Sequence, residues 1–581
     1  MTNGADLAVA ALRRAGVTVA FGLPGVHSLA LWRALGESPI RLVGVRHEQA
    51  AAYAADGYAR ATGKVGVALT TTGPGAANTL AAVGEAWASR QPVVVIATDI
   101  PARLRRPGVW RGVLHEATDQ AAMFEPVVKR TIRVRDPSEL DHAVSHAIQS
   151  ALTAPARPVY LEVPTDLLGA EVTEEAADSA AAERATERAR ATLRGHGPAP
   201  ALDQDAAERA TERARAAQPA AWQHRPDEHH LARAVEALER SRRPLVWAGG
   251  GAVQAGAGEA VARLAERIVA PVVLTYSARG LLGRGHPCLV EATAHVPEVG
   301  ALWDETDLVI AIGSDLDGMM TQGWKQPQPP HLVAINVDPA DAAKNYLPDV
   351  LLEADAAAGA ARLADRVPAR AGLDALRRRV GELNRTTRAA LVESDPEATA
   401  FLDAMERTLP ADATVVCDMC IPGYWLGGYH RAPAPRRLSY PLGWGTLGCA
   451  FPQALGAALA DAGPVVSVSG DGGFLYACGE LATAAQERIS LTAVIVDDGG
   501  YGMLRFDQDL RGHPREGVDL HTPDFVALAR SFGVRADAVD GLDEHFEGML
   551  GHHVRLDEPS VLVAKAALAP PPNVSPRWYR R

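Results

Sequence analysis

Short, uninterrupted apolar runs recur along the whole chain, and in residues 1–170 they alternate with longer segments rich in alanine. Typical runs are KVGVALTTTGPG, PVVVIATDIP, DLVIAIGSD and LTAVIVDDGG. A strand that is apolar at every position is buried on both faces, which is typical of a parallel sheet covered by helices on both sides. The sequence therefore predicts an α/β fold built from doubly wound parallel sheets.

The length of the chain and a local change in its composition predict three such domains in series. With 581 residues the chain is too long for one hydrophobic core. We expect an N-terminal domain at 1–171, a central domain at 226–370 and a C-terminal domain at 371–581. Residues 172–225 are rich in Ala, Glu and Arg, and the segment AERATERAR occurs there twice. Because alanine buries little surface, this stretch is predicted to be an exposed helical or disordered linker.

The composition argues against several classes of protein. No apolar run approaches the roughly 20 residues that span a bilayer, and the N-terminus lacks a signal pattern, so we expect a cytoplasmic protein that does not bind membranes. The net charge of −12 argues against nucleic acid as the partner. Cys417 and Cys420 form a CxxC pair. They have neither a second pair nor histidines at zinc spacing, which favours thiols at a strand end over a zinc or redox site.

Two carboxylates follow two neighbouring predicted strands of the C-terminal domain. Asp471 lies between Gly470 and Gly472 at the end of VVSVSG, and Asp498 follows the next strand, LTAVIV. Ligands of open parallel sheets bind beyond the carboxyl ends of the strands, and a pair of hard oxygen ligands suits Mg²⁺ or Ca²⁺. Either motif alone is explained as well by a Gly-Asp turn. Their pairing behind two buried strands favours a metal site.

The line GDGGFLYACGELATAAQERISLTAVIVDDGGYGM resembles the signature of thiamine-diphosphate-dependent enzymes, in particular the acetolactate synthase-like branch. The resemblance extends over all three domains and excludes only the linker. It implies that Asp471, the Asp498 side chain and the Gly500 carbonyl hold Mg²⁺, which bridges to the diphosphate of thiamine diphosphate. The other cofactor contacts implied in this region are Gly445, Gly470, Gly472, Gly473 and Tyr501.

The sequence departs from this family at one position of the expected metal site. The family usually has Asn-Asn or Asn-Asp where this chain has Asp497-Asp498. Asp497 therefore adds a carboxylate near an anionic diphosphate, where like charges repel. Three outcomes remain open for it: a protonated carboxyl, a side chain turned away, or a neighbouring cation that balances the charge.

Two further residues gain a role through the resemblance. Glu48, in RHEQAAAYAADGYAR, is predicted on the first turn of a helix, where a carboxylate is favoured electrostatically without any catalytic role. The resemblance implies that Glu48 bonds the aminopyrimidine ring of the cofactor and so promotes formation of the reactive ylid. Leu447, in GT-x-G, is explained by packing alone, whereas the resemblance implies that it props the cofactor in its bent shape.

Two histidines of the N-terminal domain are candidates for proton transfer. His27 and His115 lie in predicted loops, and histidine titrates near neutral pH; surface positions are the alternative. Contacts to the diphosphate are also expected near 420–424, where the chain matches the family poorly and no ligand is named. In the central domain, IAIGSDLDGMM replaces the Arg-Phe-Asp-type motif of FAD-binding relatives, which argues against FAD.

The resemblance implies a homodimer or homotetramer with the active site between subunits. The implied reaction is thiamine-diphosphate-dependent cleavage and formation of C–C bonds on a 2-oxo acid such as pyruvate, followed by carboligation to a second carbonyl compound. Three alternatives stay open. They are a simple 2-oxo acid decarboxylase, a non-catalytic homologue that acts as a binding or assembly subunit, and an FAD-dependent oxidase.

Overall fold

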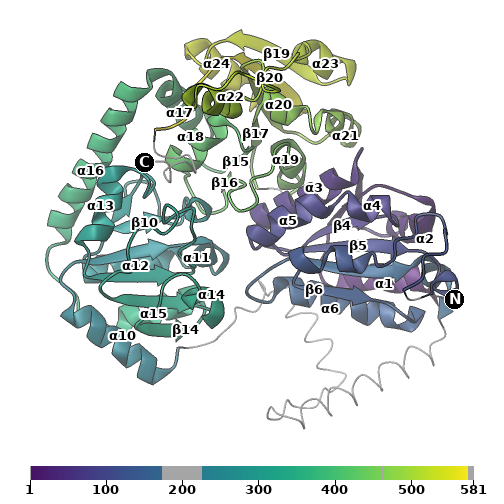
Figure 1. Cartoon of the computed structure of the whole chain (residues 1–581), viewed down its shortest axis with the longest axis horizontal. Helices are drawn as coiled ribbons and strands as arrows, with labels where there is room; N and C mark the ends of the chain where they lie inside the picture. Colours follow the sequence, from purple (N-terminus) through teal and green to yellow (C-terminus); the bar gives the residue numbers. More distant parts are fainter. Residues whose placement is uncertain (1, 107, 173–225, 461, 573–581) are drawn as a thin grey trace. The chain divides into compact units, whose positions relative to one another are not determined.

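Three parallel sheets, each with six strands and flanking helices, make up the part of the chain that the computed structural model describes (Figure 1). The described residues are 2–106, 108–172, 226–460 and 462–572. The predicted α/β class with three doubly wound domains is confirmed. The predicted linker lies, apart from Val172, outside the described residues, and the domain boundaries stay predictions.

The first sheet has the strand order β3-β2-β4-β5-β7-β6. All residues of β2, β4, β5 and β7 are buried, whereas the edge strands β3 and β6 are partly exposed. Helices α1 and α6 pack against each other beside this sheet. The strands are β2 (Val19–Gly22), β3 (Arg41–Gly44), β4 (Gly66–Thr70), β5 (Val93–Asp99), β6 (Arg130–Arg133) and β7 (Val159–Pro164). The helices are α1 (Gly4–Arg14), α2 (Leu29–Gly36), α3 (Glu48–Thr62), α4 (Pro74–Ala77), α5 (Leu80–Ala88), α6 (Leu140–Leu152) and α7 (Thr165–Gly169). A short antiparallel pair, β1 (Thr2–Asn3) and β8 (Glu171–Val172), joins the ends of this region.

The second sheet has the order β11-β10-β9-β12-β13-β14. Its strands are β9 (Pro244–Ala248), β10 (Val272–Leu274), β11 (Leu289–Val290), β12 (Leu308–Ile312), β13 (Leu332–Asn336) and β14 (Val350–Glu353). Its helices are α10 (Glu228–Arg240), α11 (Gly250–Gln254), α12 (Gly258–Ile268), α13 (Pro297–Glu305), α14 (Pro339–Ala343) and α15 (Ala356–Arg366). Several of these helices begin where an aspartate caps free backbone N–H groups, such as Asp227 before α10 and Asp355 before α15.

The third sheet has the order β16-β15-β17-β18-β20-β19. Its strands are β15 (Thr414–Cys417), β16 (Leu438–Ser439), β17 (Val465–Gly470), β18 (Thr492–Asp497), β19 (Arg535–Asp540) and β20 (Ser560–Lys565). Its helices are α17 (Pro396–Thr408), α18 (Ile421–Tyr429), α19 (Ala450–Ala458), α20 (Asp471–Phe474), α21 (Leu481–Glu487), α22 (Gly502–Leu510), α23 (Phe525–Ser531) and α24 (Glu544–His553).

The long helix α16 (Leu373–Ser394) joins the second sheet region to the third along the chain (Figure 1). One continuous cluster of buried apolar side chains runs from Leu231 in α10 to Leu568 after β20, so these two regions share a core. The first sheet has its own core, which includes Leu12, Leu69 and Leu161. By its contacts the chain divides into two compact units, and nearly all of the first sheet region belongs to one of them. Among the described residues, no helix has both the length and the apolarity needed to cross a membrane.

Candidate active site

The carboxyl ends of β17 and β18 bring two acidic side chains to one edge of the third sheet. The two strands are parallel neighbours, and Gly470 pairs with Val496. Asp471 follows directly as the first residue of α20, and Asp498 comes two residues after Val496. Both line a cavity of about 200 Å³. The structure thus places these two predicted metal ligands in the same cavity.

The carboxylate oxygens in this cavity are buried without hydrogen-bond partners. Asp471 is fully buried, and neither of its oxygens, nor Oδ1 of Asp498, has a partner among the described residues. Burial, with a smaller contribution from the charges of Asp498 and Asp497, raises the pKa of Asp471 to about 7. Burial also raises the pKa of Asp498. Buried polar atoms without partners are rare, and a divalent cation would satisfy all three oxygens.

The remaining metal ligands would have to come from the backbone, the cofactor or water. Within the described ranges, no group of three or more His, Cys, Asp or Glu side chains is arranged to hold a metal ion. Gly500 lines the same cavity as the two aspartates. Gly500 therefore lies at the cavity where its carbonyl is predicted to bind, and the two aspartates suit the cation that the sequence implies.

A cation lies beside Asp498, but among the described residues no ion pair joins it to Asp497, so the three outcomes for the extra acidic charge stay open. Arg505 of α22 donates a hydrogen bond of 3.1 Å from Nη1 to the Asp498 carbonyl oxygen, and its Nη2 lies 3.9 Å from Asp498 Oδ1. Its Nε lies 2.9 Å from Asp519 Oδ1. Asp497 Oδ1 accepts a hydrogen bond of 3.3 Å from the Gly499 amide. Sequence reasoning missed Arg505, because only the folded helix turns it toward Asp498.

The loop that carries Leu447 lies against the same cavity. Leu447 and Gly445 both line the cavity, together with Gly470, Gly472, Gly473 and Tyr501. Gly448 has φ +77°, a left-handed conformation that favours glycine. The structure therefore gathers all the cofactor contacts predicted for the C-terminal domain around one cavity, while their roles stay predictions.

Asp418 connects three segments of this cavity wall, and sequence reasoning missed it. It follows β15 and is fully buried. Its Oδ2 accepts a hydrogen bond of 2.9 Å from the Gly448 amide, and its Oδ1 accepts one of 3.1 Å from the Met419 amide. A Cβ on Gly473 would lie 2.5 Å from Asp418 Oδ2, so that position has room only for glycine. Burial raises the pKa of Asp418 to about 6. The only sequence signal was its place at a strand end.

The segment after β15 also lines the cavity. Its lining residues are Met419, Cys420, Ile421, Pro422 and Tyr424. Helix α18 begins here, and the free N–H groups of a helix N-terminus suit a phosphate. The Cys417 and Cys420 thiols are unbridged, and burial raises the pKa of both, which keeps them neutral. Neutral thiols are poor metal ligands and nucleophiles.

Glu48 is held by the segment between β4 and α5. It is the first residue of α3 and is 8% exposed. Asn78 Nδ2 donates a hydrogen bond of 2.9 Å to Glu48 Oε2. A Cβ on Gly75 would lie 3.3 Å from Glu48 Oε1, so the TTGPG segment passes beside the carboxylate; we call residues 71–75 the 71–75 loop, and its last two residues open α4. Glu48 and Asp471 belong to different compact units of the chain.

The two candidate histidines adjoin the same 71–75 loop. Their ring centroids are 5.5 Å apart. His27 Nδ1 lies 2.8 Å from Thr72 Oγ1, and the His115 backbone lies against Gly73. Burial, followed by the neighbouring His115, lowers the pKa of His27. The structure therefore brings both histidines together and places one loop beside them and beside Glu48.

Comparison with known proteins identifies the family. Residues 2–123 match the N-terminal TPP binding domain of thiamine pyrophosphate enzymes, residues 231–363 match the central domain, and residues 420–564 match the C-terminal TPP binding domain. A probable 2-ketoarginine decarboxylase from Pseudomonas aeruginosa is 36% identical over 552 residues, which cover 94% of this chain and 90% of that protein.

Two other relatives carry a different name. A probable acetolactate synthase large subunit from Methanocaldococcus jannaschii is 29% identical over 561 residues, covering 93% of this chain and 88% of that protein. An acetolactate synthase from Bacillus subtilis is 28% identical over 567 residues, covering 93% and 89%. The chain belongs to the thiamine pyrophosphate enzyme family and is similar along its length to the acetolactate synthase-like branch.

Proposed function

We propose that this thiamine-diphosphate-dependent enzyme uses Mg²⁺ and releases CO₂ from a 2-oxo acid. The observation that carries the proposal is that both carboxylate oxygens of Asp471 and Oδ1 of Asp498 are buried without a hydrogen-bond partner among the described residues, and that both side chains line one cavity with Leu447. A cavity with these residues suits a cation that anchors a diphosphate. When bound, thiamine diphosphate supplies a nucleophilic thiazolium carbon and an acceptor for the electrons left behind by CO₂.

The side chains of the enzyme would bind, orient and move protons around that cofactor. Asp471, Asp498 and the Gly500 carbonyl would hold Mg²⁺. Leu447 offers an apolar surface at the cavity wall, which suits its proposed role of supporting the cofactor in a bent shape. Glu48 would share a proton with the aminopyrimidine ring, and the Asn78 amide would keep its carboxylate in place.

His27 and His115 would transfer protons to and from the substrate. His27 has a lowered pKa and so is neutral at pH 7, where it can accept a proton. His115 lies beside it and can pass a proton on. The assembly is proposed to be a homodimer or homotetramer, as the resemblance implies, and light scattering of the purified protein measures it.

Simple decarboxylation is our first candidate for the overall reaction that follows from CO₂ release. The relative with 36% identity is named a decarboxylase, which supports a lyase that releases an aldehyde. Carboligation is the second candidate, because other relatives are named acetolactate synthases. The two candidate functions also differ in the donor 2-oxo acid. For the decarboxylase it would be 2-ketoarginine, which carries a guanidinium group, and for the carboligase the sequence resemblance favours pyruvate.

One experiment separates these functions. The purified protein with thiamine diphosphate and Mg²⁺ is incubated with pyruvate, 2-ketoarginine and a panel of other 2-oxo acids, with and without an added aldehyde. CO₂ release is followed continuously and products are identified by mass spectrometry. An aldehyde as the product supports the decarboxylase, and an adduct of two substrates supports the carboligase. Bound cofactor without CO₂ release from any donor would contradict both and favour the non-catalytic homologue. Flavin absorbance of the purified protein tests the prediction that FAD is not used.

A further inference from the structure

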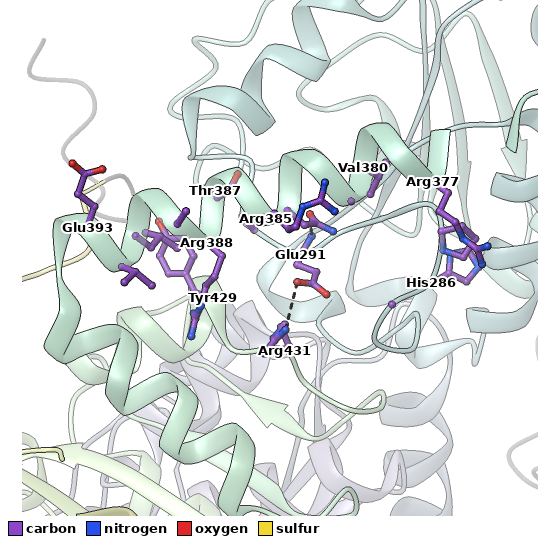
Figure 2. Close-up of a pocket in the computed structure, with 18 residues that line it drawn as sticks. His286, Glu291, Arg377, Val380, Arg385, Thr387, Arg388, Glu393, Tyr429 and Arg431 are labelled. Carbon is purple, nitrogen blue, oxygen red and sulfur yellow. Dashed lines mark hydrogen bonds and ion pairs between the residues drawn. The ribbon is translucent and has the colours of Figure 1, made fainter. Parts of the chain in front are cut away.

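A second cavity lies between the central and C-terminal regions, along one side of α16 (Figure 2). Its volume is about 760 Å³, within the roughly 300–1,000 Å³ of small-molecule sites. One wall is α16 itself. The opposite wall consists of residues 285–287 and 291–292 beside β11, together with Tyr429 and Arg431 at the end of α18. The wall residues thus come from three elements that are far apart in the sequence.

This cavity is separate from the one that holds Asp471. The two cavities share no lining residue. None of the predicted cofactor, metal or catalytic residues lines the cavity beside α16. A ligand bound there would therefore leave the thiamine diphosphate site free, and the proposed reaction gives no reason for this cavity.

Positive charge predominates on its walls. Four arginines and two glutamates line it: Arg377, Arg385, Arg388, Arg431, Glu291 and Glu393. Glu291 is an ion-pair partner of Arg431, at 4.0 Å (Figure 2). His286 adds no charge at pH 7, because burial lowers its pKa. The lining side chains therefore carry more positive than negative charge, and attraction for an anion rests on the arginines that lack a buried partner.

Two of the arginines are available for a ligand. Arg388 pairs with Asp403, and Arg431 donates a hydrogen bond of 2.8 Å from Nε to Glu406, so both have internal partners. Arg385 has only Glu382, at 3.5 Å on the exposed surface, where an ion pair contributes little. Arg377 has no hydrogen bond or ion pair with any described residue. A planar guanidinium group with free N–H groups suits a carboxylate or a phosphate.

The rest of the lining is apolar and includes two buried hydroxyl groups. Val380, Leu391 and the ring of Tyr429 present apolar surface on either side of the cavity. Thr387 and Tyr429 are each at least 90% buried, yet their hydroxyls have no hydrogen-bond partner among the described residues. Buried hydroxyls normally have a partner. A ligand or a water molecule that enters from the cavity could supply one.

We propose that this cavity binds an organic anion with an apolar body. Its carboxylate or phosphate group pairs with Arg377 or with Arg385, which lie about two turns apart on α16, and its apolar body lies against Val380, Leu391 and Tyr429. Because the cavity joins the central and C-terminal regions, the bound anion stabilises both against unfolding.

The binding test uses a fluorescent anion with an aromatic body, 1-anilinonaphthalene-8-sulfonate, with the holoenzyme saturated in thiamine diphosphate and Mg²⁺. We expect saturable binding of one molecule per chain at this cavity. Hexanoate and hexyl phosphate then compete for the site, and the stronger competitor identifies the head group. Hexylammonium has the same body with the opposite charge and is expected not to compete. Equal competition by hexylammonium would overturn the proposal.

Two matched pairs of exposed positions on α16 locate the binding. Ala389 lines the cavity and Ala390 does not, so Ala389→Trp fills the space while Ala390→Trp leaves it open. We expect Ala389→Trp to weaken probe binding by about tenfold or more, and Ala390→Trp to leave it within about twofold. Arg377 lines the cavity and Arg378 does not. Arg377→Ala combined with Arg385→Ala is expected to weaken binding roughly fivefold, and Arg378→Ala less than about twofold.

All of these positions are exposed, so the variants are expected to fold, and thermal unfolding checks this. Probe binding that is absent from the wild-type holoenzyme, or unchanged by Ala389→Trp, would overturn the proposal. CO₂ release from a 2-oxo acid is measured in parallel. Failure of the proposed function then shows as missing turnover, independently of probe binding.

Discussion

Asn78 donates a hydrogen bond of 2.9 Å from its side-chain amide to Glu48 Oε2. Glu48 opens α3, and Asn78 follows the short helix α4 in a different loop. The bond therefore fixes a carboxylate from outside its own helix. A fixed carboxylate loses less freedom when it meets a ring nitrogen of a cofactor, which is the preorganisation that proton transfer requires.

Asn78→Ala is expected to lower turnover by about tenfold, because the carboxylate remains but is free to rotate. The loss should fall on kcat more than on KM for the 2-oxo acid, since Asn78 is proposed to position Glu48 and not to bind substrate. Steady-state kinetics measures both constants. An unchanged kcat would show that Glu48 does not need this partner.

Glu48→Gln is expected to slow exchange of the thiazolium proton by about 10²–10⁴-fold, because an amide cannot share a proton with the aminopyrimidine. The enzyme is mixed with deuterated water, the exchange is stopped with acid after set times, and NMR of the cofactor measures how much thiazolium proton remains. Thermal unfolding and Mg²⁺ binding should match the wild type, since Glu48 lies in a different compact unit from Asp471. Wild-type exchange in this variant would rule out the proposed activation.

Removal of divalent metal is expected to release thiamine diphosphate. With the cation gone, the carboxylates of Asp471 and Asp498 face the anionic diphosphate directly and repel it. Dialysis against excess chelator followed by cofactor assay measures the release, and Asp471→Asn should weaken Mg²⁺ binding in the untreated protein. Full retention of the cofactor in excess chelator would contradict the proposed metal bridge.

Asp418→Asn is expected to weaken thiamine diphosphate binding by about tenfold. The replacement has the same shape, but its NH2 group cannot accept, so the hydrogen bond from either the Gly448 or the Met419 amide is lost. Cys449→Ala is the matched control, because it removes the weak thiol donor 3.5 Å from Asp418 Oδ1 and keeps the carboxylate itself. Calorimetric titration measures both affinities. Equal affinity in Asp418→Asn and the wild type would mean that Asp418 does not position this loop.

A buried histidine is expected to make the central region sensitive to acid. His295 lies with Nε2 2.7 Å from the Met319 carbonyl oxygen, and burial lowers its pKa to about 4. The folded state therefore disfavours the protonated ring, and stability is lost as the pH falls from about 6.5 towards 4. The loss is roughly 3 kcal/mol if the unfolded pKa is about 6.5.

His295→Gln tests this pH dependence, because glutamine keeps a donor for Met319 and does not titrate. Denaturant unfolding at pH 7 and pH 4.5 measures the difference in stability. The wild type should lose more stability than the variant over this interval. His552→Gln, at a position that is exposed, is the control and should behave as the wild type does.

The strands were predictable because their sequence reports burial directly. Every residue of β4, β5 and β12 is buried, and each strand contains an unbroken apolar run in the sequence. Parallel neighbours then bring their carboxyl ends to one edge, which is why Asp471 and Asp498 could be paired before the fold was known.

The partners of those residues were not predictable in the same way. Asn78, Arg505 and Asp418 act through contacts that depend on how loops and helices pack, and nothing in their local sequence distinguishes them from turn or surface residues. The proximity of His27 to His115 was equally unpredictable, because several strands separate the two residues along the sequence. Local patterns report burial and periodicity, whereas these pairings arise only from the tertiary fold.

The 71–75 loop adjoins Glu48, His27 and His115 alike. A substitution or insertion in these five residues is expected to displace the Glu48 carboxylate and both imidazoles in concert, and to leave Asp471 and Asp498 in place. Selection for a new donor substrate therefore has a compact target in this enzyme, and laboratory evolution is best begun by randomising this loop.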